Sequence, residues 1–136
     1  MNHADVSYAV RLMPGQDLRK EIEDFAKKNK IHAGWIVTCV GSLTNYNIRF
    51  ANQTDGSKGS GHFEILSLVG TVSDNGCHIH ISIADSTGKT MGGHLLVGSR
   101  IYTTAEIILV KSSRYIFTRE KDGSTPWEEL KISELQ

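Results

Sequence analysis

Hydrophobic and polar residues alternate along most of this chain, and a period of two residues is typical of β-strands. One stretch follows a different period, because Leu18, Ile22 and Ala26 recur at the spacing of a helix face. Short turns between the later strands favour antiparallel neighbours. The pattern predicts an α+β fold, in which one long helix accompanies an antiparallel sheet of about six to eight strands. The expected strands are residues 7–13, 33–42, 43–50, 62–72, 77–85, 89–98, 101–111 and 114–120.

Two segments lack a strand pattern. Residues 51–61 are rich in Gly, Ser, Asn and Asp and are expected to form a loop. The chain is polar from Asp122 onward, and the stretch "PWEELK" favours a short helix there. A length of 136 residues is typical of one domain. We therefore expect a single domain over residues 1–136, with its core at about 5–118 and a polar C-terminal tail at 119–136.

Charge and cysteine content narrow the class of protein. Fifteen basic residues balance fifteen acidic ones, which argues against a general affinity for nucleic acid. Cys39 and Cys77 form no CxxC pair and no secretory leader is visible, so we expect two buried thiols in a reducing compartment. The longest apolar runs, such as "AEIILV", are too short to span a membrane. These features predict a soluble cytoplasmic protein without a membrane partner.

Three of the six histidines fall within the stretch "CHIHISIADSTGKTMGGHLL". Residues two apart in a strand share a face, so His78 and His80 point one way. Ile79, Ile81 and Ile83 point the other way, and this face is the natural core side. Whether His94 joins the first two histidines depends on the register of the hairpin that follows.

The glycine in the "STG" turn favours one register. A two-residue loop would turn His94 to the opposite face, whereas a three-residue loop with Gly88 in the left-handed region pairs Asp85 with Lys89. In that register His80 lies directly opposite His94. The Cβ atoms of His80 and His94 would then be about 5 Å apart, and His78 would lie diagonally across from His94 at about 7 Å. The turn chemistry thus predicts that the three imidazoles converge.

Three neutral imidazoles on rigid strands form a facial arrangement that Zn²⁺ accepts, with a fourth position left for water or a ligand. Nickel, copper or iron also suit imidazole ligands. Gly92 and Gly93 beside His94 would let a ligand or another backbone approach. The alternative is a polar, solvated sheet face, because the H-x-H spacing occurs by chance in many strands. The spacing of the histidines is compatible with both a metal site and a solvated sheet face.

Several blocks together resemble the plant-and-prokaryote-conserved (PPC) domain, which follows the AT-hook in plant AT-hook nuclear proteins. The resemblance spans about residues 5–118, and His62 stands where the plant signature Gly-Arg-Phe-Glu-Ile-Leu has arginine. It implies a compact α+β domain that assembles as a homotrimer. Stand-alone prokaryotic members are similar in carrying the H-x-H and Gly-Gly-His strands, which implies a metal at His78, His80 and His94. The blocks are "RLMPGQDL" (11–18), "GSL" (41–43), "GHFEILSLVG" (61–70), "HIHISIADSTGKTMGGHL" (78–95) and "YTTAEIIL" (102–109).

Three other residues carry candidate chemistry. Arg11 lies in an apolar strand, which favours a buried or interfacial ion pair with Glu106 or Glu64, and a ligand anion is the alternative. Glu106 could reach the histidines from an adjacent strand as an acid or base, or form a surface salt bridge. Ser42 lacks the G-x-S-x-G frame of a nucleophile, so we interpret Gly41-Ser42 as a bulge, with Ser42 kept as a ligand or interface candidate.

These observations support three hypotheses for function. The first is a homotrimeric binding and assembly module with a three-histidine divalent metal site and a possible small-molecule ligand. The second is a hydrolase-like enzyme that uses metal-activated water. The third, DNA binding by a regulator, has less support because no Arg-Gly-Arg-Pro run is present and the net charge is zero. We favour the first.

Overall fold

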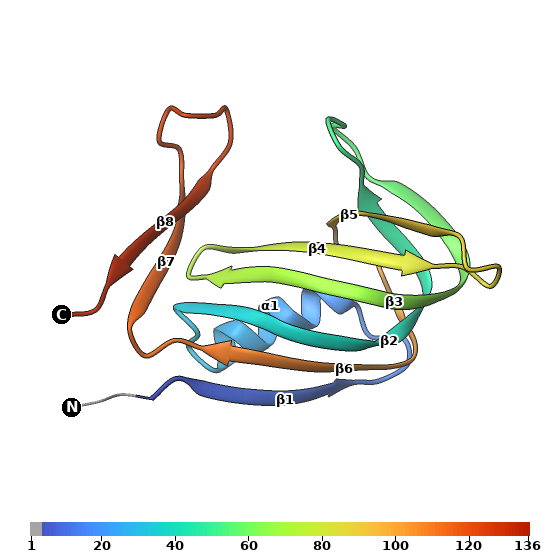
Figure 1. The fold of residues 1–136 in the computed structure, drawn as a ribbon, viewed down its shortest axis with the longest axis horizontal. Coiled ribbons are helices and arrows are strands. Elements are labelled where there is room, and N and C mark those ends of the chain that lie inside the picture. The colour runs from blue at the N-terminus through green and yellow to red at the C-terminus, as the bar shows by residue number, and fades with distance from the viewer. Residues whose placement is uncertain (1–3) are drawn as a thin grey trace.

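The computed structural model describes residues 4–136, and within them it contains eight strands and one helix. All strand pairs are antiparallel, which confirms the α+β class expected from the sequence (Figure 1). The elements are β1 (Val6–Leu12), α1 (Leu18–Lys28), β2 (Ala33–Arg49), β3 (Ser57–Ser73), β4 (Gly76–Ala84), β5 (Thr90–Leu95), β6 (Ile101–Lys111), β7 (Tyr115–Glu120) and β8 (Glu129–Glu134).

Six strands form one strongly curved sheet in the order β1-β6-β2-β3-β4-β5. The far end of β2 returns to pair with β5, so that Ile48 lies opposite Leu95 and Arg49 opposite His94. Breaks in the register of β2 accompany this curvature. One falls between Gly41 and Leu43 in the pairing with β6, which confirms the bulge expected at this point. The curved sheet brings three strands, β2, β4 and β5, together at His94.

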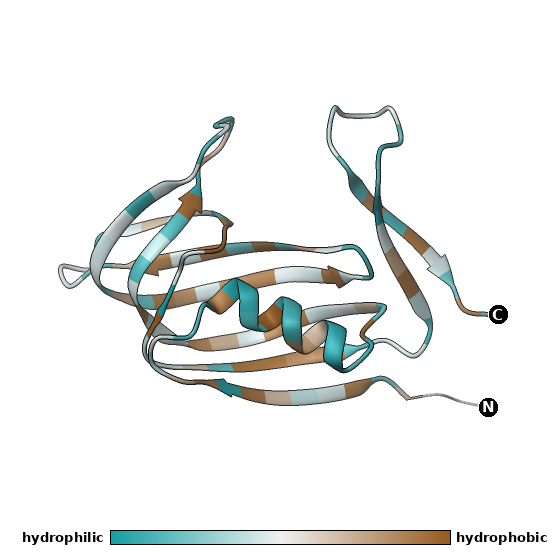
Figure 2. Ribbon diagram, turned by 180° about the vertical axis from the view of Figure 1, so that it is seen from behind, coloured by the Kyte–Doolittle hydropathy of each residue, from teal (hydrophilic) through white to brown (hydrophobic). Residues whose placement is uncertain are grey.

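Helix α1 closes one face of the sheet. The Asp17 carboxylate caps it by accepting a hydrogen bond from the Lys20 N–H, and such a cap stabilises a helix by about 1 kcal/mol. Its buried residues Leu18, Ile22 and Ala26 pack against the strands, as the helical spacing predicts. Figure 2 shows the polar residues of the helix facing outward, away from the sheet. Within residues 4–136, no helix is long and apolar enough to cross a membrane.

The C-terminal segment differs from its sequence-based expectation. The short helix expected around "PWEELK" is wrong, because residues Glu129–Glu134 form strand β8, paired with β7. A six-residue ladder and the Lys131–Glu120 ion pair, 3.2 Å between nitrogen and oxygen, outweigh a weak local helix preference. The β7–β8 hairpin stands away from the main sheet as an arm (Figure 1).

The loop expected at residues 51–61 is also shorter than predicted. Strand β3 begins at Ser57, which pairs with Ile48, so Gly59 and Gly61 lie in a strand. Polar and glycine residues are compatible with this strand because the pairing with β2 supplies the backbone hydrogen bonds. The first residues of β3 therefore pair with the end of β2 that also meets β5.

Candidate metal centre

Strand β4 separates its histidines from its isoleucines as the alternation predicts. Ile79, Ile81 and Ile83 are buried in the core. His80 is exposed and His78 is half-buried on the opposite face of the strand. The histidines are therefore held by a strand whose other face is anchored in the core.

The hairpin register predicted from the turn is confirmed. The Asp85 N–H donates to the Lys89 carbonyl at 2.9 Å, and Gly88 adopts a φ of 84°. His80 consequently lies directly opposite His94 in the β4–β5 ladder. The third loop position requires a left-handed backbone conformation, which glycine adopts at little energetic cost. Gly88 therefore suits a three-residue loop.

The three imidazoles converge at one point outside the core. His78 Nε2 lies 3.1 Å from His80 Nε2, and the ring centroids of His78 and His94 are 5.2 Å apart. One ring nitrogen from each histidine lies within 4.8 Å of the other two. This donor set fits a divalent transition metal, because three imidazoles can surround one ion and leave a further position open.

The environment keeps two of the rings neutral. Burial lowers the pKa of His94 from 6.5 to about 4, and the nearby Arg49 and Arg19 guanidinium groups add to that shift. Burial also lowers the pKa of His78, with a further contribution from His80. Only a deprotonated imidazole nitrogen binds a metal, so these rings need not lose a proton at neutral pH.

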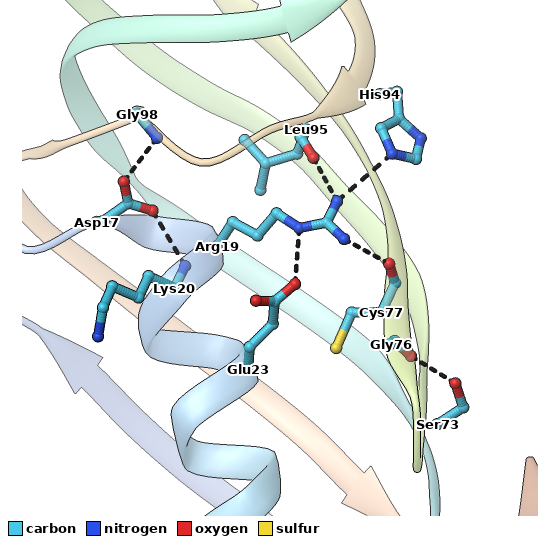
Figure 3. A network of polar contacts seen from close by, with 10 residues as sticks. All are labelled: Asp17, Arg19, Lys20, Glu23, Ser73, Gly76, Cys77, His94, Leu95 and Gly98. Carbon is cyan, nitrogen blue, oxygen red and sulfur yellow. Dashed lines mark hydrogen bonds and ion pairs between the residues drawn. The ribbon is translucent and has the colours of Figure 1, made fainter. Parts of the chain in front are cut away.

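Arg19 connects helix α1 to the histidines, a contact that the sequence analysis missed. Figure 3 shows its guanidinium between β4 and β5, where it donates to the Leu95 carbonyl at 2.6 Å and to the Cys77 carbonyl at 2.8 Å. Its Nη1 lies 3.4 Å from His94 Nε2, and its Nε pairs with Glu23 at 2.8 Å. On a helical wheel Arg19 is an ordinary polar-face residue, so no sequence signal pointed to this role.

A pocket of about 590 Å³ opens beside the histidines. The C-terminal arm supplies most of its wall, which the sequence analysis also missed because a polar tail with a short helix was expected there. Arg49 contributes from the end of β2, where its guanidinium lies 6.0 Å from the centre of the Trp127 ring. The lining residues are Arg49, Cys77, His78, His94, Arg119, Lys121, Pro126, Trp127, Glu128 and Glu129.

Glu106 does not join the histidines. It lies on β6, opposite Arg11 of β1 and Val40 of β2, and two strands separate β6 from β4 in the sheet order. Arg11 is exposed within the chain rather than buried, and its Nε donates to Thr104 Oγ1 at 3.1 Å. Of the two alternatives for Glu106, a reach to the histidines from an adjacent strand does not fit this strand order, because β2 and β3 lie between.

Neighbouring strands of the chain surround Ser42, Gly92 and Gly93. The buried Ser42 hydroxyl lies 2.8 Å from Thr103 Oγ1, within the bulge of β2. A Cβ atom at Gly93 would lie 2.6 Å from the Arg49 carbonyl oxygen, and one at Gly92 would lie 2.6 Å from the Ile81 carbonyl oxygen. Neighbouring backbone thus occupies the space beside both glycines, as one of the two sequence-based alternatives proposed.

Comparison with known proteins places the chain in a family. The family model of the Plants and Prokaryotes Conserved (PCC) domain matches residues 3–113. The chain belongs to the PCC domain family. This is the plant- and prokaryote-conserved domain that the sequence blocks resemble, so the resemblance is confirmed.

Proteins similar to this PCC chain differ widely in length. The Bifunctional protein GlmU of Synechococcus sp. (strain JA-3-3Ab) is 44% identical over 128 residues, which cover 94% of this chain and 21% of that protein. The chain thus spans about a fifth of the length of the curated relatives it matches.

Two solved structures show how closely the PCC fold is shared. A hypothetical protein from Salmonella cholerae-suis is 34% identical with a TM-score of 0.94, over 96% of this chain and 95% of that one. A protein from Archaeoglobus fulgidus, described as metal-containing, is 29% identical with a TM-score of 0.78, over 91% of each chain.

Proposed function

We propose that this PCC chain is a divalent-metal-binding module in which His78, His80 and His94 are the ligands. The observation that carries the proposal is the convergence of three imidazole nitrogens within 4.8 Å on two rigidly paired strands. The Archaeoglobus relative described as metal-containing adds support. Zinc suits this donor set best, and nickel, copper or iron are alternatives that the same ligands accept.

Elemental analysis of the purified 136-residue chain tests the metal proposal. We expect about one zinc per chain after equilibration with zinc and dialysis, and a loss of at least about tenfold in affinity in His80→Ala and His94→Ala. The matched control is His32→Ala, because His32 pairs with Asp74 outside the cluster. Full zinc occupancy in His94→Ala would overturn the ligand assignment.

We further propose that the module works as a homotrimer. Large apolar side chains are exposed on the outer side of the sheet, where solvent contact is unfavourable and a second copy could cover them. The face comprises Val37, Val40, Leu66, Val69 and Tyr102. Val69 also pairs directly with His80, so this face adjoins the histidines.

Metal-dependent hydrolysis ranks second to binding. The pocket of about 590 Å³ beside the histidines favours it, because a purely structural zinc site is usually closed. A hydrolase also needs a general base near the metal. Glu106 lies elsewhere, and the pocket's Glu129 is already engaged by Thr125 at 2.8 Å and Arg119 at 3.8 Å, which leaves Glu128 on the exposed C-terminal arm as the one candidate base of the lining. Binding of a ligand therefore accounts for more of the site than hydrolysis does.

A further inference from the structure

The pocket beside the histidines is lined by more cations than carboxylates. Arg119 is accounted for, because it pairs with Glu129 at 3.8 Å and donates to the Glu128 carbonyl at 2.8 Å. Arg49 and Lys121 also line the pocket, and within residues 4–136 neither has a carboxylate at ion-pair distance. The carboxylate of Glu128 is the one acidic group of the lining without an ion pair among the described residues.

The proposed metal would increase this positive charge. Three neutral imidazoles supply no negative charge, so a bound divalent ion keeps both of its positive charges. The Arg19 guanidinium also lies within 3.4 Å of His94 Nε2, on the helix side of the cluster. Positive charge gathered in a concave site attracts anions and raises their local concentration.

The dimensions of the pocket suit a small molecule. Its volume of about 590 Å³ falls within the range of roughly 300–1,000 Å³ that is typical of small-ligand sites. Trp127 forms one wall and is 61% exposed, so a flat apolar surface stands beside the charged groups. Arg49 is held in place by Trp127 and by its hydrogen bond to the Gln53 carbonyl at 3.2 Å.

We propose that this pocket binds a small ligand bearing an oxyanion, either a carboxylate or a phosphate ester. The anionic group contacts the metal at the three histidines, and Arg49 and Lys121 hold it from the pocket side. The metal contact rests on the proposed function above, whereas the contacts with Arg49 and Lys121 come from the pocket alone. A guanidinium is suited to this task because its fork of N–H groups matches both oxyanions.

Trp127 can report ligand binding directly. The chain has two tryptophans, so a Trp35→Phe background leaves Trp127 as the only one. The probes are inorganic phosphate and acetate, titrated separately at constant ionic strength into the zinc-loaded and the metal-free 136-residue chain. We expect a saturable change in Trp127 fluorescence, with tighter binding to the zinc-loaded form. The relative affinities of the two probes distinguish a phosphate from a carboxylate ligand.

Variants of the cationic residues test the assignment. Arg49→Gln should weaken binding about tenfold or more, because a charge-assisted hydrogen bond contributes about 1.5–3 kcal/mol. Lys121→Gln is the second variant, and Lys121 is exposed in the loop between β7 and β8. The matched control is Arg114→Gln, an arginine of the same arm that pairs with Glu134 outside the pocket.

The outcomes separate the two proposals, because zinc uptake is measured on the same samples. Zinc uptake without a saturable fluorescence change overturns the anion site and leaves the metal site standing. The anion site is also overturned if the variants Arg49→Gln, Lys121→Gln and Arg114→Gln bind the anion with equal affinity. Absence of zinc uptake overturns the proposed metal function itself, and with it the metal contact of the anion.

Discussion

Cys39 and Cys77 are buried thiols whose chemistry is set by their surroundings. Both are free, as the sequence predicts, and each is less than a tenth exposed. Burial raises the pKa of Cys39 to about 12, and the carboxylate of Glu106 adds to that shift. Burial likewise raises the pKa of Cys77 to about 11, with a contribution from Glu23. Neither thiol therefore forms much of the reactive thiolate at neutral pH.

We expect thiol labelling to distinguish the folded from the unfolded chain. At pH 8 a disulfide reagent should modify Cys77, in a Cys39→Ser background, about 100-fold more slowly in buffer than in urea. In the folded chain the pKa values of both thiols lie above the unfolded value of 9.0. Their contribution to the free energy of unfolding is therefore complete below pH 9 and falls as the pH rises toward 11. Equal labelling rates in buffer and urea would contradict this prediction.

Strand β5 depends on a close backbone approach at Gly93. A Cβ atom there would lie 2.6 Å from the Arg49 carbonyl oxygen and 2.9 Å from Ile48 Cγ2, so β2 would have to move. We expect Gly93→Ala to lower the free energy of unfolding by about 1–3 kcal/mol, measured by urea denaturation. Zinc occupancy should fall as well, because β2 pairs with β5 at His94.

The control for this strand is Thr90→Ala. Thr90 is exposed at the start of β5, and its hydroxyl makes one long hydrogen bond, 3.3 Å, to the Gly88 carbonyl. A loss of about 0.5 kcal/mol or less is expected there. If Gly93→Ala and Thr90→Ala behave alike, the closure of β2 on β5 does not hold the site.

Elements that form locally were the most predictable from the sequence. The β4–β5 register follows from a loop of three residues and one glycine, so the meeting of His80 and His94 could be derived without a structure. Helix α1 was equally accessible because its periodic face and its cap lie within one segment. In both cases the determining residues are close neighbours in the chain.

Long-range contacts were not predictable in the same way. Arg49 reaches the site only because β2 curves back onto β5, and no pattern near Arg49 indicates that pairing. The C-terminal arm did carry a usable signal, since Leu130 and Ile132 alternate with Lys131 and Ser133, which is a strand period. The polar composition of the segment concealed that period, and with it the pocket wall at Trp127.

The apolar outer face of the sheet leads to a prediction about how copies of the chain assemble. If it is the trimer contact, light scattering should give a mass near three times 15.0 kDa for the 136-residue chain. Val40→Glu should shift the protein toward the 15.0 kDa chain, because Val40 is 63% exposed on this face and a charge cannot be covered there without cost.

Ile132→Glu is the matched control, because Ile132 is similarly exposed, at 59%, but lies on the C-terminal arm. Its mass should equal that of the wild type. A wild-type mass of 15.0 kDa at micromolar concentration would rule out the proposed trimer, and equal effects of the two substitutions would place the contact elsewhere.

The contact between His78 and His80 has a consequence for their tautomers. Their Nε2 atoms are 3.1 Å apart, and a hydrogen bond between two nitrogens needs one donor and one acceptor. Without a metal, such a hydrogen bond puts one ring's proton on Nε2 and the other's on Nδ1, whereas a metal bound at both Nε2 atoms requires both rings to hold their proton on Nδ1. Two identical side chains, two residues apart on the same strand, are therefore inequivalent in the metal-free pair, and metal binding at both Nε2 atoms makes them alike by moving one ring's proton to Nδ1.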